Sequence, residues 1–257
     1  MKRFAVVTGA SSGIGMEFAR QLARKGYSLV LTARREERLK ELANALPVEC
    51  KIIPADLSKE EECCRLFQEI KDLKVTVFIN NAGFGSCGKF IEGSLEKELD
   101  MIRLNIEAMH ILMKLMLQKM QAENAGYILN VASSAGLLPA GPYMSTYYAT
   151  KAYVTSLTRG VAEELKEAGS RVYVGCLCPG PVDTEFNAVA NVEFALKGIH
   201  AKDCVAYALK QMSHRQTVIV PTFLMKLATT SGRMIPQKLC VQITARQQKK
   251  KWKKSSS

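Results

Sequence analysis

The sequence predicts a single α/β domain built on a doubly wound parallel sheet, followed by a basic C-terminal extension. Short runs rich in valine and isoleucine alternate with segments of helical periodicity along the first 221 residues. These runs show little alternation of polar and apolar residues, which is typical of strands buried on both faces of a parallel sheet. Neither an internal repeat nor a Gly/Ser linker interrupts the alternation, so we expect one domain over residues 1–221.

The elements follow one another at the spacing of strand–helix–strand units. We expect strands at residues 3–8, 28–32, 51–54, 75–80, 126–133, 171–178 and 217–221. We expect helices between them at residues 12–25, 35–46, 59–72, 95–121, 147–168 and 202–212. Methionines recur along the 95–121 segment and should pack in the core or at a subunit interface: Met101, Met109, Met113, Met116 and Met120.

The turn after the first strand has the pattern of a dinucleotide-binding loop and makes the predicted domain a Rossmann fold. Gly9 permits a tight turn, Gly13 lets the backbone approach a pyrophosphate, and Gly15 allows close packing of helix on strand. The free N–H groups at the start of the helix, together with its dipole, attract the anion. We expect the whole loop to bind cofactor: Gly9, Ser11, Ser12, Gly13, Ile14 and Gly15.

The end of the second predicted strand indicates which dinucleotide is preferred. An NAD site usually has an acidic residue there to bind the ribose 2′-hydroxyl, whereas an arginine favours the 2′-phosphate of NADP. This strand ends without an acid, and Arg34 follows it directly. Glu36 and Glu37 belong to the first turn of the next helix, where the dipole stabilises them. The sequence therefore predicts NADP(H) over NAD(H).

Nearly all of the net charge of +12 lies in the C-terminal part of the chain. Residues 1–203 carry 25 basic and 24 acidic side chains, whereas residues 204–257 carry 11 basic and no acidic ones. The extension over residues 222–257 contains a helical stretch at 238–246 and ends in five lysines around Trp252, the only tryptophan. Such a segment can be a solubilising terminus, a contact with an anionic membrane surface, or a means of steering an acidic substrate. No recognition motif supports nucleic-acid binding.

The first residues and the cysteines favour a cytoplasmic protein. Only four apolar residues follow Lys2 and Arg3, too few for a secretory signal, and the chain has no apolar run long enough to span a membrane. The eight cysteines lack zinc-site spacing, and none of the three histidines has a companion at ligand spacing. We expect free thiols in a reducing compartment and no metal site.

Tyr147 and Lys151 stand four residues apart at the start of a predicted helix. Residues at this spacing share a helix face, so the phenol and the ammonium project together. A neighbouring cation favours the phenolate and lowers the tyrosine pKa, which prepares it for proton transfer near neutral pH.

Seven motifs, taken together and in order, resemble those of the short-chain dehydrogenase/reductase family over residues 1–220. They are the Thr8–Gly15 loop, Asp56-Leu57, Asn80-Asn81-Ala82-Gly83, Asn105, Asn130–Ser133, Tyr147-x-x-x-Lys151, and Pro179-Gly180 with Thr184. The resemblance implies a homodimer or homotetramer that interconverts a ketone and a secondary alcohol by hydride transfer.

The resemblance also implies roles for individual residues. Tyr147 exchanges the proton, Lys151 lowers its pKa and binds the nicotinamide ribose, and Asn105 holds a water linked to Lys151. The other residues implied to bind the cofactor are Asp56, Leu57, Asn81, Ala82, Gly83, Pro179, Gly180, Val182 and Thr184.

The serine that polarises the carbonyl is assigned to Ser133, with Ser134 as the alternative. The family's serine ends the fifth strand, which selects Ser133, but it usually precedes the tyrosine by 13 residues, which selects Ser134. A one-residue insertion within residues 137–144 reconciles both with Ser133. Tyr148 is expected to serve packing, because its partner at i+4 is not a lysine, and Tyr143 is a candidate for the pocket lining.

Residues 181–201 are predicted to form a substrate lid whose apolar content suits a fatty, steroid-like or aromatic ketone. The resulting hypothesis is an NADP(H)-dependent reductase or dehydrogenase acting on an apolar substrate, with 3-oxoacyl and hydroxysteroid compounds as leading classes. The alternative is a catalytically silent NADP-binding regulator or scaffold whose basic extension contacts a membrane or an acidic partner. The intact set Asn105, Ser133, Tyr147 and Lys151 favours the enzyme.

Overall fold

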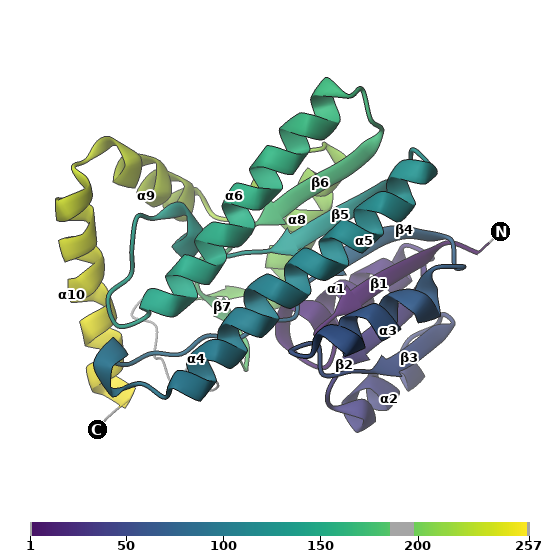
Figure 1. The fold of residues 1–257 in the computed structure, drawn as a ribbon, viewed down its shortest axis with the longest axis horizontal. Helices are drawn as coiled ribbons and strands as arrows, with labels where there is room; N and C mark the ends of the chain where they lie inside the picture. The colour runs from purple at the N-terminus through teal and green to yellow at the C-terminus, as the bar shows by residue number, and fades with distance from the viewer. Residues whose placement is uncertain (1, 186–197, 256–257) are drawn as a thin grey trace.

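A computed structural model describes residues 2–185 and 198–255 of the chain. Most of the predicted lid, residues 186–197, lies outside the described residues. The described residues show the predicted doubly wound α/β architecture, with a parallel sheet between two layers of helices (Figure 1).

The central sheet has seven parallel strands in the order β3-β2-β1-β4-β5-β6-β9. The strands are β1 (Phe4–Thr8), β2 (Ser28–Ala33), β3 (Cys50–Pro54), β4 (Val75–Asn80), β5 (Gly126–Val131), β6 (Val172–Leu177) and β9 (Val218–Ile219). The order reverses between β1 and β4, and ligands of such sheets bind in the crevice outside the carboxyl ends of the strands at that point. Each predicted strand is present, although β9 is shorter than predicted.

Helices cover both faces of the sheet because their apolar stripes need a partner surface. One face packs against α1 (Gly13–Arg24), α2 (Glu36–Asn44) and α8 (Ala201–Ser213). The other packs against α3 (Glu60–Ile70), α5 (Met109–Ala122) and α6 (Ser145–Glu167). Short elements complete the carboxyl edge: η1 (Phe90–Glu92), η3 (Ser134–Leu137), and a small sheet of β7 (Val182–Asp183) and β8 (Ile199–His200).

The helix predicted at residues 95–121 is divided by a wide turn. It consists of α4 (Leu95–Ile102), the π-helical segment η2 (Arg103–Ala108) and α5. Asn105 lies in η2, and single π turns of this kind are frequent at functional sites. The five methionines predicted to pack in the core or at an interface are all buried within this chain.

The last part of the chain differs from the predicted extension. It forms two helices, α9 (Phe223–Met234) and α10 (Gln237–Ser255), which pack on the α/β domain. Cys240, Thr244 and Gln248 of α10 are buried, with exposed fractions of 3–5%. Described residues 222–249 therefore belong to the body of the molecule and are not a separate tail.

The structure shows the state of the thiols, the grouping of metal-ligating side chains and the character of the helices. All eight cysteines are free thiols. Among the described residues, histidines, cysteines and acids do not gather in groups of three or more that could hold a metal ion. In the same part of the chain, none of the helices combines the length and the apolar character that crossing a bilayer requires.

Candidate active site

The glycine-rich loop after β1 closely approaches its neighbours at each of its glycines. Gly9 and Gly13 have φ values of +66° and +54°, a conformation that favours glycine. A Cβ atom on Gly15 would lie 2.3 Å from the Gly9 carbonyl oxygen, so α1 can pack this close to the loop only without a side chain there. The loop thus leaves a backbone cradle at the N-terminus of α1, which suits a pyrophosphate.

Asn81 ties the loop to the end of β4. Its Nδ2 donates to the Thr8 carbonyl at 2.8 Å, and its backbone N–H donates to Thr8 Oγ1 at 2.8 Å. The Ala82 N–H donates to the same hydroxyl at 2.9 Å. These bonds fix the carboxyl ends of β1 and β4 relative to each other, which holds the crevice open at the point where the strand order reverses.

Arg34 and Arg35 directly follow β2 at the carboxyl edge of the sheet. Arg34 is exposed, lines the cavity, and forms no ion pair with another described residue. Arg35, which the sequence analysis did not assign, donates through Nε and Nη2 to Ser11 Oγ at 3.3 and 3.2 Å. Glu185 bonds both Arg38 and Arg35, and these bonds lower the pKa of its carboxyl. The charges of Arg35 and Arg38 are therefore partly neutralised, whereas that of Arg34 is not.

Almost every residue predicted for the site lines one cavity of about 450 Å³. Only Gly15 and Asn105 do not line the cavity, because both lie behind the residues that form its surface. The predicted residues that do are Gly9, Ser11, Ser12, Gly13, Ile14, Arg34, Asp56, Leu57, Asn81, Ala82, Gly83, Ser133, Tyr147, Lys151, Pro179, Gly180, Val182 and Thr184. The order of the parallel strands explains this convergence, since the strand ends that carry these residues share one edge of the sheet.

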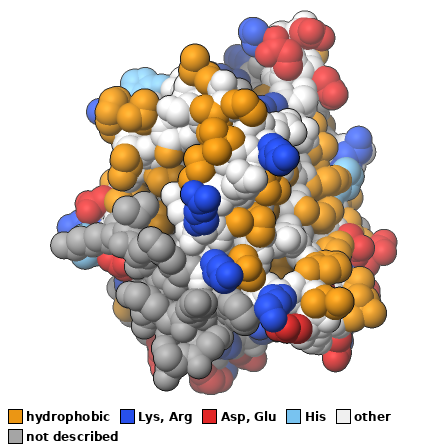
Figure 2. Space-filling model, turned by 90° about the vertical axis from the view of Figure 1, so that its left-hand side faces the viewer, with side chains coloured by type: hydrophobic (Ala, Val, Ile, Leu, Met, Phe, Trp, Pro, Cys, Tyr) orange, Lys and Arg blue, Asp and Glu red, His pale blue; other side chains and the backbone are white. Residues whose placement is uncertain are grey.

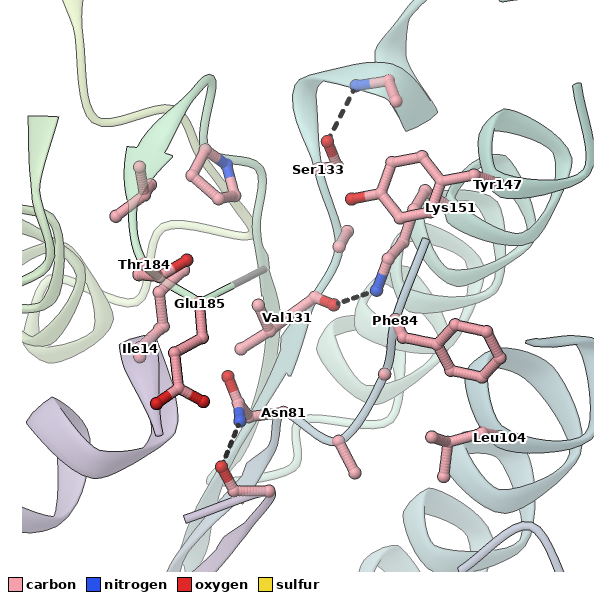
Figure 3. A pocket seen from close by; sticks show the side chains of 18 of the residues that line it. Ile14, Asn81, Phe84, Leu104, Val131, Ser133, Tyr147, Lys151, Thr184 and Glu185 are labelled. Carbon is pink, nitrogen blue, oxygen red and sulfur yellow. Dashed lines mark hydrogen bonds between the residues drawn. The ribbon is translucent and has the colours of Figure 1, made fainter. Parts of the chain in front are cut away.

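Tyr147 and Lys151 project from the first turns of α6 into this cavity (Figure 3). The Lys151 ammonium donates to the Val131 carbonyl at 2.9 Å and lies 5.8 Å from the centroid of the Tyr147 ring. Both side chains are buried, with exposed fractions of 8% for Tyr147 and 6% for Lys151. The hydroxyl end of Tyr147 faces Ser133, which follows β5.

Burial dominates the proton affinities of this pair. It raises the pKa of Tyr147 to about 12, although a hydrogen bond with Ser133 opposes the rise. It lowers the pKa of Lys151 to about 8, because the ammonium loses its hydration. The sequence predicts a lowered tyrosine pKa. The structure gives the opposite direction, because desolvation of the buried phenolate raises the pKa of Tyr147, while the Lys151 ammonium bonds the Val131 carbonyl.

The two candidate serines have different partners. Ser133 bonds the Tyr147 hydroxyl and accepts a hydrogen bond from the Ala135 N–H at 3.1 Å. Ser134 lines the same cavity, and its N–H donates to the Pro179 carbonyl at 2.8 Å. The geometry favours Ser133 as the hydroxyl that acts together with Tyr147.

Asn105 positions the chain beside Lys151 and does not face the cavity. Its Oδ1 accepts from the Phe84 N–H at 3.0 Å, and its Nδ2 donates to the Phe84 carbonyl at 2.9 Å and to Thr150 Oγ1 at 3.1 Å. A Cβ on Gly83 would lie 2.8 Å from Asn105 Oδ1 and 3.4 Å from the Lys151 nitrogen. Gly83 and Asn105 together hold the loop after β4 against the lysine.

The cavity is also lined by residues that the sequence motifs did not assign to the site. Apolar side chains line it: Phe84, Leu104, Leu138, Met144 and Met225. Tyr148 was predicted to serve packing; it is buried in a small cluster with Tyr147 but also lines the cavity. Its hydroxyl accepts a hydrogen bond from Gln248 at 2.6 Å. Tyr143 does not line the cavity, so that prediction was wrong; its carbonyl accepts the Gly88 N–H at 2.9 Å.

The last two helices form one wall of this cavity. Met225 of α9 lies so close to Gly180 that a Cβ there would be 2.7 Å from the methionine Cγ. Gln247 and Gln248 of α10 also line the cavity. This wall could not be predicted from the sequence, because the buried residues in the described part of α10 are Cys240, Thr244 and Gln248, which form no apolar stripe.

Comparison with protein families agrees with this geometry. The family described as short chain dehydrogenase matches residues 3–193. The chain belongs to the short-chain dehydrogenase/reductase family. Members of this family are oxidoreductases that bind nicotinamide cofactors.

Individual relatives show how far this short-chain dehydrogenase resembles known proteins. It is 35% identical over 241 residues to human dehydrogenase/reductase SDR family member 11, covering 83% of this chain and 91% of that protein. A short-chain dehydrogenase from Sphingobium yanoikuyae in complex with NADPH is 30% identical, with a TM-score of 0.81 and coverage of 92% and 94%. One from Burkholderia phymatum in complex with NAD is 25% identical, with a TM-score of 0.81 and coverage of 89% and 92%.

Proposed function

We propose that this short-chain dehydrogenase is an NADP(H)-dependent oxidoreductase that interconverts an apolar ketone and its secondary alcohol. The observation that carries the proposal is the meeting of Ser133, Tyr147 and Lys151 with the glycine-rich loop in one cavity. A nicotinamide dinucleotide fits the loop, since Gly9, Gly13 and Gly15 form a cradle that a Cβ atom would fill. When bound, such a cofactor supplies or accepts a hydride.

Tyr147, Ser133 and Lys151 have separate roles in the proposed proton transfer. In reduction, the Tyr147 hydroxyl donates its proton to the oxygen of the substrate carbonyl as the alkoxide develops. With its pKa raised to about 12, Tyr147 is fully protonated at neutral pH and ready to act as the acid. Ser133 Oγ donates a hydrogen bond to the same oxygen and polarises the carbonyl. Lys151 provides positive charge beside the ring and a donor for the cofactor ribose, and in oxidation Tyr147 accepts the proton.

The preference for NADP(H) is supported by the charge at the adenosine end of the crevice. Arg34 follows β2, lines the cavity and has no acidic partner among the described residues. Arg35 is held toward the loop by Ser11. A ribose 2′-phosphate carries two negative charges that such guanidinium groups bind well.

Replacing Arg34 tests this preference. Arg34→Ala should raise the KM for NADPH about ten- to a hundredfold, the value of a lost charge-assisted hydrogen bond, and leave the KM for NADH unchanged. Arg24→Ala is the matched control, because it removes the same charge from an exposed residue that does not line the cavity and has no acidic partner among the described residues. Steady-state kinetics with both cofactors measure the effect. Equal changes for NADPH and NADH in the Arg34 variant would contradict the assignment.

The pH dependence of kcat/KM for ketone reduction should reflect the titration of Lys151. We expect kcat/KM to fall above a pH of about 8, because the lysine loses its proton there and with it the charge beside Tyr147. The tyrosine itself remains protonated throughout this range. Lys151→Arg retains the charge at all these pH values, so its profile should stay flat where the wild type declines. A wild-type profile without an inflection in this region would contradict the role of Lys151.

The apolar substrate class is supported by the lining of the cavity beyond Tyr147. Phe84, Leu138 and Met144 present apolar surface there, and Met225 adds to it from α9. Tyr148, Gln247 and Gln248 add polar groups on this side. An elongated ketone with a largely apolar body, such as a 3-oxoacyl or steroid-like compound, matches this distribution.

The direct experiment follows NADPH absorbance with a panel of ketones that includes 3-oxoacyl esters and steroids. Turnover of apolar members and not of small polar ones supports the proposal. Tight NADPH binding with no turnover across the panel would overturn it and favour a catalytically silent NADP-binding regulator.

We also propose that the protein is a homodimer or homotetramer, as expected from the family. Light scattering of the purified protein measures the mass of the assembly.

A further inference from the structure

Exposed apolar side chains gather at one end of the molecule. Among the described residues, every large hydrophobic side chain that is exposed lies on η1, α4, α9 or α10, with Tyr153 as the exception. In Figure 1 these four elements occupy the end of the molecule where α10 and the C-terminus lie. Contiguous exposed apolar surface of this kind marks an interaction site more often than chance exposure.

Helix α9 presents apolar residues outward as well as inward. On the inner side, Met225 contacts Gly180, and Gly232 lies close to Leu138. On the outer side, Phe223, Leu224 and Leu227 are exposed to 81%, 58% and 54%. A surface helix of a water-soluble domain normally turns polar residues to solvent, so this outer side lacks its partner.

Helix α10 continues the same surface. Its inner side consists of the buried Cys240, Thr244 and Gln248, whereas Leu239 and Ile243 are exposed to 46% and 41%. Met234, at the end of α9 just before the turn, is exposed to 83%. We call the set Phe223, Leu224, Leu227, Met234, Leu239 and Ile243 the apolar face.

Basic side chains accompany the apolar face on the same two helices. Lys226, Lys238, Arg246 and Lys249 are exposed, and none of them pairs with an acidic side chain in the described part of the chain. No acidic residue follows Asp203, and four further lysines with Trp252 come after Lys249. Figure 2 shows this end face-on, with Lys and Arg side chains among hydrophobic ones and Asp and Glu toward its margins.

The apolar face is the outside of the wall that closes the substrate cavity. Met225 of α9 and Gln247 and Gln248 of α10 line the cavity, while their neighbours on the same helices form the face. Whatever covers the face therefore lies one helix away from the substrate.

We propose that the apolar face of α9 and α10 is a docking surface for an anionic lipid membrane. Leucine and phenylalanine side chains insert at the boundary between headgroups and acyl chains, and the lysines and arginines bind the anionic headgroups. The charge selects this occupant. A second copy of the chain would bring two strongly basic, acid-free faces together, whereas an anionic membrane neutralises them. Docking needs neither cofactor nor turnover, so it stands apart from the proposed reaction.

Vesicle flotation of the full chain tests the docking. The protein should float with phosphatidylglycerol/phosphatidylcholine vesicles and remain behind with phosphatidylcholine alone. Leu224→Asp combined with Leu227→Asp should weaken partitioning at least about tenfold, because charged groups replace the inserting side chains. Replacing Lys249, Lys250, Lys251, Lys253 and Lys254 by glutamine should weaken it at least as much. Tyr147→Phe should float like the wild type, which separates this result from any result on catalysis.

A matched control removes the same charge elsewhere. It replaces five exposed lysines outside the face by glutamine: Lys25, Lys71, Lys74, Lys166 and Lys202. This variant should float nearly as well as the wild type. If both lysine variants lost vesicle binding equally, the binding would depend on net charge alone and not on this face, which would overturn the proposal. Undiminished flotation of the folded Leu224/Leu227 variant, checked by NADPH binding, would overturn it too. So would a fall in solution mass of that variant, because a second copy would then cover the face.

Discussion

Tyr147→Phe should reduce kcat for ketone reduction by about a thousandfold or more, the upper part of the range for loss of a general acid. The substitution removes only the hydroxyl, and the ring of Tyr147 keeps its buried place beside Met144 and Tyr148. NADPH binding should therefore remain within a factor of about two, since the glycine-rich loop is untouched. Stopped-flow measurement of hydride transfer and fluorescence titration of NADPH separate the two effects.

Neighbouring residues provide the controls for this result. Ser133→Ala should also lower kcat severely, whereas Ser134→Ala should not, because only Ser133 bonds the tyrosine hydroxyl. Tyr148→Phe should change KM more than kcat, since this tyrosine lines the cavity and bonds Gln248. If Tyr147→Phe kept a substantial fraction of kcat, or if Ser134→Ala were the more damaging serine variant, the assignment of the proton donor and its partner would be wrong.

Gly15→Ala should disrupt both cofactor binding and stability. The added methyl carbon would lie 2.3 Å from the Gly9 carbonyl oxygen and 2.5 Å from Asn81 Nδ2, and neither the backbone nor the bonded amide can move freely. Helix α1 must shift away from the loop, which we expect to cost about 1–3 kcal/mol of folding free energy. The NADPH dissociation constant should rise about tenfold or more, because the N–H groups of the cradle move with the helix.

Gly160→Ala is the matched control for this substitution. Gly160 is an exposed position of α6 with no atom within 4 Å of an added Cβ. Alanine there should raise the free energy of unfolding by about 0.5–1 kcal/mol, because it removes the conformational freedom of a glycine in a helix. Urea unfolding and calorimetric titration of NADPH measure both variants. Similar behaviour of the two would show that the close approach at Gly15 does not constrain the loop.

The residues predicted for the cofactor side converge on one cavity because they follow strand ends. Parallel strands bring their carboxyl ends to one edge, so Gly9, Asn81 and Ser133 converge although they lie far apart in the sequence. The strand ends were recognisable from Val/Ile-rich runs, and the turns from their glycines. Arg35 was missed because its approach to Ser11 depends on the direction of a side chain, which no spacing rule provides.

The substrate side could not be predicted in the same way. Its wall on α10 is held by the bond from Gln248 to Tyr148, two residues 100 positions apart, and not by an apolar stripe. Lysines dominate the composition of this segment and conceal the buried positions between them. The raised pKa of Tyr147 was missed for a related reason. Sequence shows that a lysine is near, but only the packed structure shows that desolvation is the larger effect.

The wall formed by α9 and α10 and the proposed reacting groups lie in different parts of the sequence, so a change in one can leave the other intact. The residues proposed for proton transfer and dinucleotide binding end at Thr184, whereas α9 and α10 come from the last 35 residues of the sequence. A replacement or insertion confined to these two helices would remodel the wall around Met225 and Gln248 while sparing the proposed reacting groups. Under the proposed function, substrate range can therefore change through α9 and α10 while the proton chemistry stays the same.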